Sequence, residues 1–351
     1  MATSQFTIYT ASDANGPGYM TGLSGSLVSI LNACLVNGYG TKPGAGWTKP
    51  LADSGSVYAC YKQGAGSQRT LFINDNAPNA SAGTREAWAV GWETITSVFS
   101  GSAVANNGTG ANQFPLSSQQ GSGHVVWRKS TTADNTIRYW ILAADSSSFY
   151  LWVQPGDSGT TYNHYSFGDC FSLLGSADYW KCYIIGRAVE NNGTSNAIDW
   201  ADQLPMTQGT SGFPNVNYQY SAQPGHYIDR TAFGNGVSLP FTKRGDSGVS
   251  PNVLNAGTAP TTVIIAGVFP CPNGPDNSLY LCPLWILEPG SLSLRGRFRG
   301  LYQVCHPISS FSDGQLITGA YNYAGKTFMI VRPSYNSSFW ALEISNTVET
   351  N

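Results

Sequence analysis

Short runs of aromatic and β-branched residues, separated by turns rich in Gly, Pro, Asn and Ser, dominate this 351-residue chain. Runs of this kind favour β-strands, because branched and aromatic side chains pack well on a pleated surface. Aromatic residues make up 13% of the chain and glycine accounts for 40 residues, a composition that excludes an intrinsically disordered protein. The sequence therefore predicts a mainly β protein of α+β type, with antiparallel, sandwich-like sheets.

One amphipathic helix is predicted near the N-terminus, within "GLSGSLVSILNACLVNGYG" (residues 22–40), and we expect it to pack on a sheet. Ser24 or Ser26 is expected to cap its start, and Gly38 is expected to adopt a left-handed conformation after its end. The apolar side chains recur at helical spacing and form one face: Leu23, Leu27, Ile30, Leu31, Cys34 and Leu35.

We expect two domains, 1–155 and 156–351. The first contains the helix, a hairpin around the turn 64–67, and a three-stranded meander formed by "HVVWRKS", "TIRYWILAAD" and "SFYLWVQ". The second contains further strands, among them "YWKCYIIGRAVE", "TTVIIAGVF", "LYLCPLWIL", "LRGRFRGLYQV" and a final hairpin of "KTFMIVRP" and "FWALEIS". A long looped insertion at about 191–260 is predicted to be an arm or a segment that a partner orders.

Charge is scarce in this sequence. Only 11% of residues are charged, against about 25% in typical soluble domains, and the formal net charge is −2. No overall field attracts nucleic acid or an anionic membrane, and copies of the chain repel one another weakly. No apolar run reaches the ~20 residues that span a bilayer. The composition favours an assembled subunit over a free enzyme.

Seven cysteines are present, with no closely spaced pair of the kind that holds structural zinc, so we predict neither a metal site nor a cofactor. The N-terminal residues "MATSQ" lack the basic and apolar segments of a secretion signal. We expect reduced thiols buried in apolar runs, in a protein made in the cytoplasm. A disulfide between Cys271 and Cys282 is the alternative at one loop.

Two copies of "GDSG", at 156–159 and 245–248, match the tetrapeptide around the nucleophile of trypsin-like proteases. A serine nucleophile also needs a base histidine in a suitable context, and His124, His164 and His226 lack it. Asp-Ser-Gly is also typical of turns, because the Asp side chain bonds the nearby backbone and Gly readily adopts a positive φ. Glu86 and Glu93, seven residues apart, would point to opposite faces of one strand, so they do not form a pair of glycosidase carboxylates. No catalytic residue is predicted.

The segment "LRGRFRGLYQV" holds the one concentrated stripe of like charge, because Arg295, Arg297 and Arg299 share a face if the strand is regular. Three like charges repel unless acidic groups face them. Either the stripe is a face that is solvated or paired with carboxylates of this chain, or it faces carboxylates of a neighbouring subunit or phosphates. Three cations give weak affinity for nucleic acid, unless a ring of subunits lines a DNA channel.

Four stretches, "GLSGSLVSILNACLVNGYGTKPGAGWTKP", "GSGHVVWRKSTTADNTIRYWILAADSSSFYLWV", "RGRFRGLYQVCHPISSFSDGQ" and "SNTVETN", resemble a family of virion structural proteins of tailed bacteriophages. The resemblance extends from about residue 17 to the C-terminus, with gaps in the looped region. It implies a non-enzymatic subunit of the virion, assembled in the host cytoplasm, whose partners are copies of itself and other virion proteins. Tail or baseplate, head–tail connector and capsid surface remain open as its location.

Subunit contacts in such a protein are expected to depend on buried arginine and aromatic side chains, the types enriched at interface hot spots. The hypothesis assigns seven residues to the contacts: Arg295, Arg297, Arg299, Trp200, Phe213, Tyr218 and Tyr220. Two alternatives are kept. A carbohydrate-binding or depolymerising receptor protein predicts a cleft with convergent carboxylates and exposed tryptophan. A host-side enzyme predicts a monomer with one pocket of perturbed pKa values.

Overall fold

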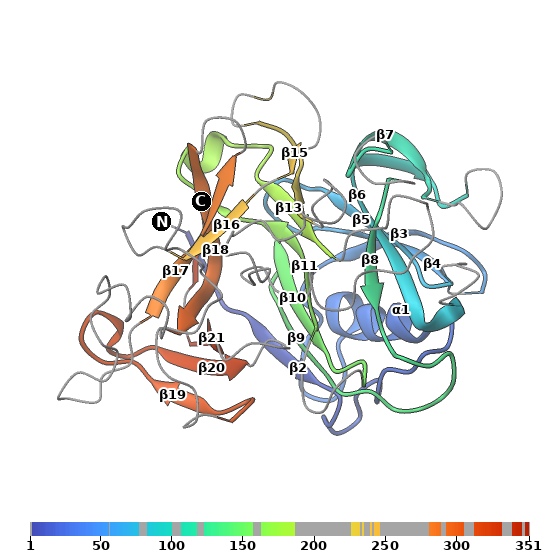
Figure 1. Ribbon diagram of the computed structural model, residues 1–351, viewed down its shortest axis with the longest axis horizontal. Helices are drawn as coiled ribbons and strands as arrows, with labels where there is room; N and C mark the ends of the chain where they lie inside the picture. The colour runs from blue at the N-terminus through green and yellow to red at the C-terminus, as the bar shows by residue number, and fades with distance from the viewer. Residues whose placement is uncertain are drawn as a thin grey trace, which may run out of the picture.

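Three antiparallel β-sheets are stacked in layers, with one short helix between two of them (Figure 1). This confirms the predicted mainly β fold with one N-terminal helix. The computed structural model describes residues 2–55, 57–76, 83–99, 107–117, 123–156, 163–186, 226–231, 234, 239–240, 242–245, 281–288, 293–304, 312–331, 339–345 and 348–350.

The first sheet has the strand order β3–β4–β5–β6–β7, and β8 pairs with β6. Its strands are β3 Thr48–Ala52, β4 Tyr58–Lys62, β5 Thr70–Asn74, β6 Glu86–Ser97, β7 Thr109–Phe114 and β8 Val125–Arg128. The hairpin predicted around residues 64–67 is confirmed, since β4 and β5 pair in antiparallel register.

The central sheet has the order β15–β14–β13–β11–β10–β9–β2. Its strands are β2 Thr7–Thr10, β9 Trp140–Ala144, β10 Ser148–Val153, β11 Asn163–Asp169, β13 Cys182–Ile185, β14 His226–Ile228 and β15 Leu239–Pro240. Both of its faces are covered. Along β10, Phe149 and Leu151 lie in the core shared with the first sheet, whereas Tyr150 and Trp152 lie in the core shared with the third. The strand is therefore apolar on both faces.

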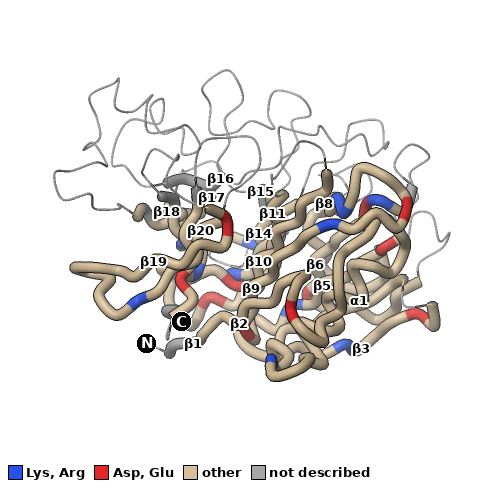
Figure 2. Tube along the Cα trace, turned by 90° about the horizontal axis from the view of Figure 1, so that it is seen from below, with Lys and Arg blue, Asp and Glu red and all other residues tan. Residues whose placement is uncertain are grey.

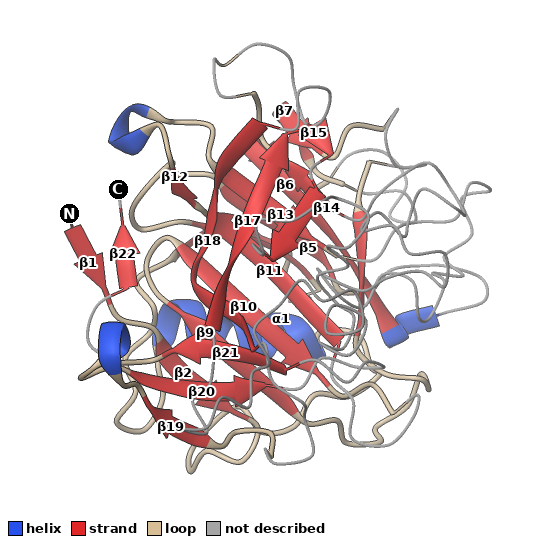
Figure 3. Ribbon diagram, turned by 60° about the vertical axis from the view of Figure 1, so that its left-hand side comes forward, coloured by secondary structure: helices blue, strands red, loops and turns tan. Residues whose placement is uncertain are grey.

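The third sheet has the order β16–β17–β18–β21–β20–β19, and the two-residue strand β12 pairs with β18. Its strands are β12 Phe171–Ser172, β16 Thr242–Gly245, β17 Leu281–Glu288, β18 Ser293–Val304, β19 Leu316–Thr318, β20 Thr327–Val331 and β21 Phe339–Glu343. The predicted C-terminal hairpin is confirmed, because β20 pairs with β21. Near the chain ends, β1 Ala2–Ser4 and β22 Val348–Thr350 form a two-stranded ribbon (Figure 3).

The predicted helix is present but shorter at its start and different at its end. It consists of α1, Ser26–Leu31, continued by the π-helical turn η1, Asn32–Asn37. Leu23 precedes it and is exposed, whereas the other five predicted face residues are buried. Gly38 has the expected positive φ, at 72°. The remaining helical turns are η2 Gly83–Arg85, η4 Gly175–Ala177 and η6 Tyr321–Tyr323.

The predicted serine cap is wrong. Gly25 occupies the N-cap position with no capping side chain of its own. Instead Asp75, which follows β5, accepts hydrogen bonds from the amides of Leu27 (2.8 Å) and Val28 (3.2 Å) and forms a buried ion pair with Lys129. A carboxylate at a helix start satisfies otherwise unpaired amides, so the helix is fixed to the first sheet by this contact.

The predicted three-stranded meander is also wrong in one strand. β9 and β10 form a hairpin in the central sheet, but β8 pairs with β6 in the first sheet. The side chain of Trp127 on β8 crosses the core and donates to the carbonyl of Ile185 on β13 at 2.9 Å. Alternation predicts which faces of a strand are apolar, but it does not predict the partner strand.

The predicted boundary at 155/156 falls between β10 and β11, which are paired neighbours in the central sheet. Residues from both halves, such as Tyr9 and Tyr227, share one hydrophobic core, so this boundary does not separate two cores. The predicted looped insertion contains strands β14, β15 and β16, and most of its remaining residues lie outside the described ranges.

Four cysteines, Cys34, Cys60, Cys170 and Cys182, are free and buried, as the sequence predicts for core thiols. The alternative of a Cys271–Cys282 disulfide lies outside the side chains that the structure describes. Among the described residues, no helix has the length and apolar character needed to cross a membrane.

Candidate functional site

The arginine stripe on β18 does not form a single surface. Arg295 and Arg299 are each only 2% exposed, whereas Arg297 is half-buried and its guanidinium carbon lies 4.8 Å from the centre of the Phe171 ring. Two of the three guanidinium groups are thus enclosed by this chain. The hypothesis of direct subunit contact is corrected for Arg295 and Arg299, because buried guanidinium groups present no surface to another subunit.

Arg295 stabilises the turn that follows β12. Its Nη2 lies 2.6 Å from Oδ1 of Asp178, and both side chains are fully buried. Asp178 also accepts hydrogen bonds from the Ser172 hydroxyl (2.5 Å) and the Trp180 amide (3.1 Å). The Asp178 carboxylate therefore links both ends of the turn to each other and to Arg295 on β18, and these contacts fix the conformation of the turn.

Large apolar side chains project from this same turn. Leu173, Leu174 and Tyr179 are about half exposed or more, at 51%, 48% and 64%. Leu294, at 52%, is also exposed, and it precedes Arg295 on β18, whose carbonyl accepts from the Leu173 amide at 3.0 Å. We call these four residues the apolar corner. None of these four residues was predicted from the sequence, although two adjacent leucines in a turn that contains Gly and Ser are a usable signal.

Arg299 joins the third sheet to the central sheet. Its guanidinium forms an ion pair with Asp145 in the β9–β10 turn, with Nη2 2.5 Å from Oδ2, and donates to the Ser148 hydroxyl at 2.7 Å. Asp145 also accepts from the amides of Ser147 (2.8 Å) and Ser148 (2.9 Å). Burial alone would lower the pKa of Arg299, but the Asp145 charge outweighs it and the pKa is raised. The arginine therefore stays charged.

The same polar network continues into the first sheet. The side-chain amide of Gln63, after β4, donates to the Ser147 carbonyl at 2.5 Å and to the carboxylate of Asp169 at 2.9 Å. Asp169, at the end of β11, also accepts from the Ser67 amide at 2.8 Å. One connected set of buried polar contacts thus links all three layers.

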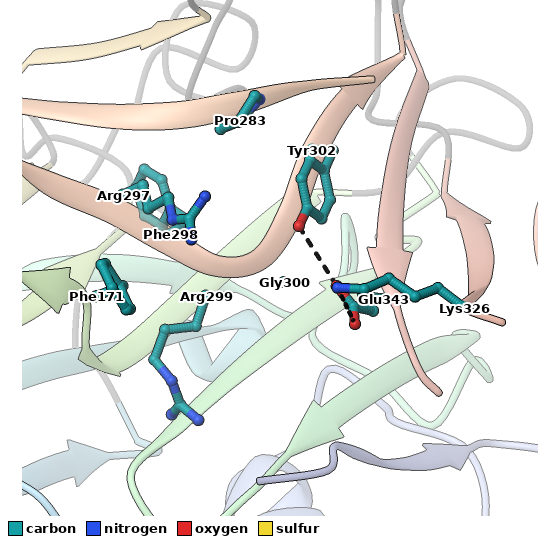
Figure 4. Close-up of a pocket in the computed structure, with 9 residues that line it drawn as sticks. All are labelled: Phe171, Pro283, Arg297, Phe298, Arg299, Gly300, Tyr302, Lys326 and Glu343. Atoms are coloured by element: carbon teal, nitrogen blue, oxygen red, sulfur yellow. Dashed lines mark hydrogen bonds and ion pairs between the residues drawn. The ribbon is translucent and has the colours of Figure 1, made fainter. Parts of the chain in front are cut away.

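A hollow lies where β18 departs from regular pairing. In the ladders formed by the described strands, Phe298, Arg299 and Gly300 have no register partner, and Gly300 has a φ of 62°. On β17 the register shifts between Pro283, which pairs with Tyr302 and has no amide hydrogen to donate, and Trp285, which pairs with Arg297. Such bulges bend a strand and redirect side chains. The hollow contains about 310 Å³ of empty space, part of it open to solvent (Figure 4).

Charged and polar groups surround this hollow. Glu343 on β21 is buried, and its carboxylate lies 2.9 Å from the ammonium of Lys326 and 3.4 Å from the hydroxyl of Tyr302. Burial and the Glu343 charge raise the pKa of Tyr302, so its hydroxyl remains a donor. Arg297 lines the other part of the hollow, and the guanidinium of Arg299 points away from it (Figure 4). Its described lining supplies one carboxylate, whereas acid–base glycoside hydrolysis uses two.

A second charge cluster joins β14 to the first sheet. Arg69 donates to Asp229 at 2.6 Å, and Glu93 on β6 pairs with Arg230. Burial raises the pKa of Asp229 to about 7, although Arg69 opposes this shift. Burial would also raise the pKa of Glu93, but hydrogen bonds from Arg230 and Asn112 outweigh it and lower that pKa.

Positively and negatively charged residues are interspersed along the described part of the chain (Figure 2).

The remaining contact candidates, Trp200, Phe213, Tyr218 and Tyr220, lie outside the described residues, as do most of the two "GDSG" turns. Within the described ranges, no group of three or more His, Cys, Asp or Glu side chains is placed to hold a metal ion.

Comparison with known proteins provides no assignment: no protein-family description and no curated protein matches this sequence.

Proposed function

We propose that this chain is a non-enzymatic structural subunit of a bacteriophage particle, present in several copies and bound to itself and to other virion proteins. The observation that supports this most is the apolar corner of Leu173, Leu174, Tyr179 and Leu294 on a chain with only 11% charged residues. Exposed apolar clusters of this kind favour protein–protein contact, because burying them removes apolar surface from water.

The rigidity of the corner supports the same proposal. The Arg295–Asp178 pair and the Asp178 hydrogen bonds hold the turn before any partner arrives. A preformed contact loses less conformational entropy on association than a flexible one. Arg295 then contributes to assembly as a positioning residue, by holding the turn, and not as a contact residue.

The occupant that we propose for the corner is a second copy of the chain. The net charge of −2 gives little repulsion between copies, and a multi-copy shell or ring needs the same contact many times. Tail or baseplate, head–tail connector and capsid surface are the three locations that fit this role.

The test is quantitative mass spectrometry of purified particles of the virus that encodes the chain, with imaging of particles carrying a label fused to it. The proposal predicts a fixed number of copies, greater than one, in every particle. Absence of the chain from intact particles, or a variable trace amount, contradicts it. The position of the label distinguishes the three locations.

A further inference from the structure

We propose that Lys129 and Asp75 form an isopeptide bond within the folded chain, so that their buried ion pair is the unreacted form of a covalent cross-link. The two side chains are 1% and 0% exposed, and the Lys129 ammonium directly contacts Oδ1 of Asp75. The residues are 54 positions apart in the sequence. This modification occurs within a single chain, so it does not depend on the proposed assembly.

The first sheet brings the two residues together and fixes their backbones. Asp75 follows β5 and Lys129 follows β8, and these two strands pair with opposite edges of β6. The Asp75 amide donates to the Val57 carbonyl at 2.9 Å, and the Lys129 amide donates to the Arg85 carbonyl at 2.9 Å. Reactive groups that are held in contact avoid most of the entropy loss of a bimolecular encounter.

Burial favours the neutral forms of both groups, which this condensation needs. Desolvation raises the pKa of Asp75, although the Lys129 charge and two backbone amides oppose the shift. Transfer of one proton from the ammonium to Oδ1, which it contacts, converts the ion pair into an amine and a carboxylic acid. The amine is the nucleophilic form of lysine.

The second oxygen of the Asp75 carboxyl group is held by two donors. Oδ2 accepts hydrogen bonds from the amides of Leu27 at 2.8 Å and Val28 at 3.2 Å. Two backbone donors on one oxygen polarise the carboxyl group and stabilise the negative charge that develops on Oδ2 when a nucleophile attacks Cγ. The site therefore combines a nucleophile with an oxyanion hole.

The bond-forming step balances without any further reactant. Nζ of Lys129 attacks Cγ of Asp75, and an electron pair of the Cγ–Oδ2 bond moves onto Oδ2. A second proton then passes from Nζ to Oδ1, the Cγ–Oδ1 bond breaks, and Oδ1 leaves as water while the Cγ–Oδ2 double bond forms again. One hydrogen stays on Nζ, and nothing is oxidised or reduced. Because both side chains are enclosed, the amide is protected from hydrolysis.

The partners that the product amide needs are already in place. Nζ of Lys129 donates to the Leu23 carbonyl at 2.7 Å, and the amide N–H keeps this acceptor. Oδ2 of Asp75 keeps the amides of Leu27 and Val28 as donors. The amide is thus hydrogen-bonded at both ends, and the cost of burying two charges is removed.

The experiment is an intact-mass measurement on the purified full chain, followed by proteolysis and tandem mass spectrometry of the peptides. The proposal predicts a mass lower than the sequence mass by one water molecule, and a branched peptide that joins Asp75 to Lys129. A chain that keeps its full sequence mass after prolonged incubation in the folded state overturns it. Loss of water without this branched peptide also overturns it, because ring closure at another aspartate loses the same mass.

Variants establish that the two side chains lose the water together. Lys129→Met and Asp75→Ala each remove one reactive group and are expected to abolish the mass loss. Lys49→Met, on the exposed strand β3, is the matched control and should retain both the mass loss and the branched peptide. Circular dichroism establishes which variants are folded, and the wild-type measurement decides the proposal where a variant is not. A mass loss that persists unchanged in Lys129→Met overturns the assignment to this pair.

Discussion

Arg299 and Asp145, 154 residues apart in the sequence, form a buried ion pair that joins β18 of the third sheet to the β9–β10 turn of the central sheet. The guanidinium also bonds the hydroxyls of Ser147 and Ser148, so the charge is both paired and hydrogen-bonded. A buried charge pair of this kind stabilises little by itself, because desolvation offsets the attraction. Its loss on one side is costly, since an unpaired charge remains in the interior.

Replacement of Arg299 by methionine is therefore expected to lower the free energy of unfolding by about 3–5 kcal/mol. The reason is that Asp145 would lose its countercharge while staying buried. Urea unfolding followed by tryptophan fluorescence measures the change. Lys49→Gln on exposed β3 is the control and should change the free energy of unfolding by less than ~0.5 kcal/mol. An equal, small effect of both substitutions would contradict the role of the pair.

Asp75 both pairs with Lys129 and accepts hydrogen bonds from the first amides of the helix, and a double substitution separates these two contributions to stability. Asp75→Asn keeps an oxygen that accepts from the amides of Leu27 and Val28, but it leaves the Lys129 ammonium buried without its carboxylate. We expect Asp75→Asn alone to destabilise the chain by about 3 kcal/mol. Adding Lys129→Met should recover part of that loss in urea unfolding. If the double variant is as unstable as the sum of the single variants, the two side chains do not interact as described.

The sequence predicted the elements whose pattern is local. Residues such as Leu27, Ile30 and Leu31 define the buried helix face through their spacing alone, and alternating aromatic residues define β10. Leu23 departs from the prediction because the chain takes a left-handed turn at Gly25, where φ is 81°, before the helix begins. Short strands such as β14, with only three residues, carry too little pattern to be separated from a loop.

The site depends on contacts that local pattern does not encode. Arg295 and Arg299 meet carboxylates 117 and 154 residues away in the sequence. Spacing placed the three arginines on one strand but could not say that two of them are buried. The bulge at Phe298–Gly300 was equally hidden, because it arises from the pairing of β18 with β17 and β21.

Two glycines with similar backbone conformations test how tightly the polar network packs. Gly66 has a φ of 74°, and a Cβ there would lie 2.3 Å from Oδ2 of Asp169, whereas Gly175 has a φ of 76° and open space around it. Gly175→Ala should cost about 1 kcal/mol, from the left-handed backbone alone. Gly66→Ala should cost at least ~1 kcal/mol more, because Asp169 must move. Equal decreases in the free energy of unfolding would contradict this, because Asp169 would then move without any loss of stability.

The raised pKa of Asp229, about 7, gives a pH dependence of known sign. The folded state holds this proton more tightly than the unfolded state, so the contribution to stability is complete below pH ~4 and is lost as the pH rises to about 7. The groups facing Asp229 are Arg69, Glu93 and Cys182, with Arg230 next to it in the chain, just after β14. Asp229→Asn removes the titration and should flatten this part of the stability profile.

The measurement is urea unfolding of both proteins at several values between pH 4 and pH 8, with the difference between them plotted against pH. That difference isolates Asp229 from Asp75 and Asp169, whose pKa values are also raised by burial. Its span is expected to reach up to roughly 4 kcal/mol. A difference that stays constant, or one of opposite slope, would show that Asp229 titrates near its ordinary value or below it.

Self-association through the apolar corner is the central claim, and sedimentation equilibrium of the purified chain tests it most directly. The prediction is a defined oligomer whose mass is a multiple of 37.5 kDa, reduced to a single chain by Leu174→Asp. Leu316→Asp, on β19 at a position that is 59% exposed against 48% for Leu174, should leave the oligomer intact. A wild-type chain that stays at 37.5 kDa at every concentration, or a Leu174→Asp variant with unchanged mass, contradicts the claim.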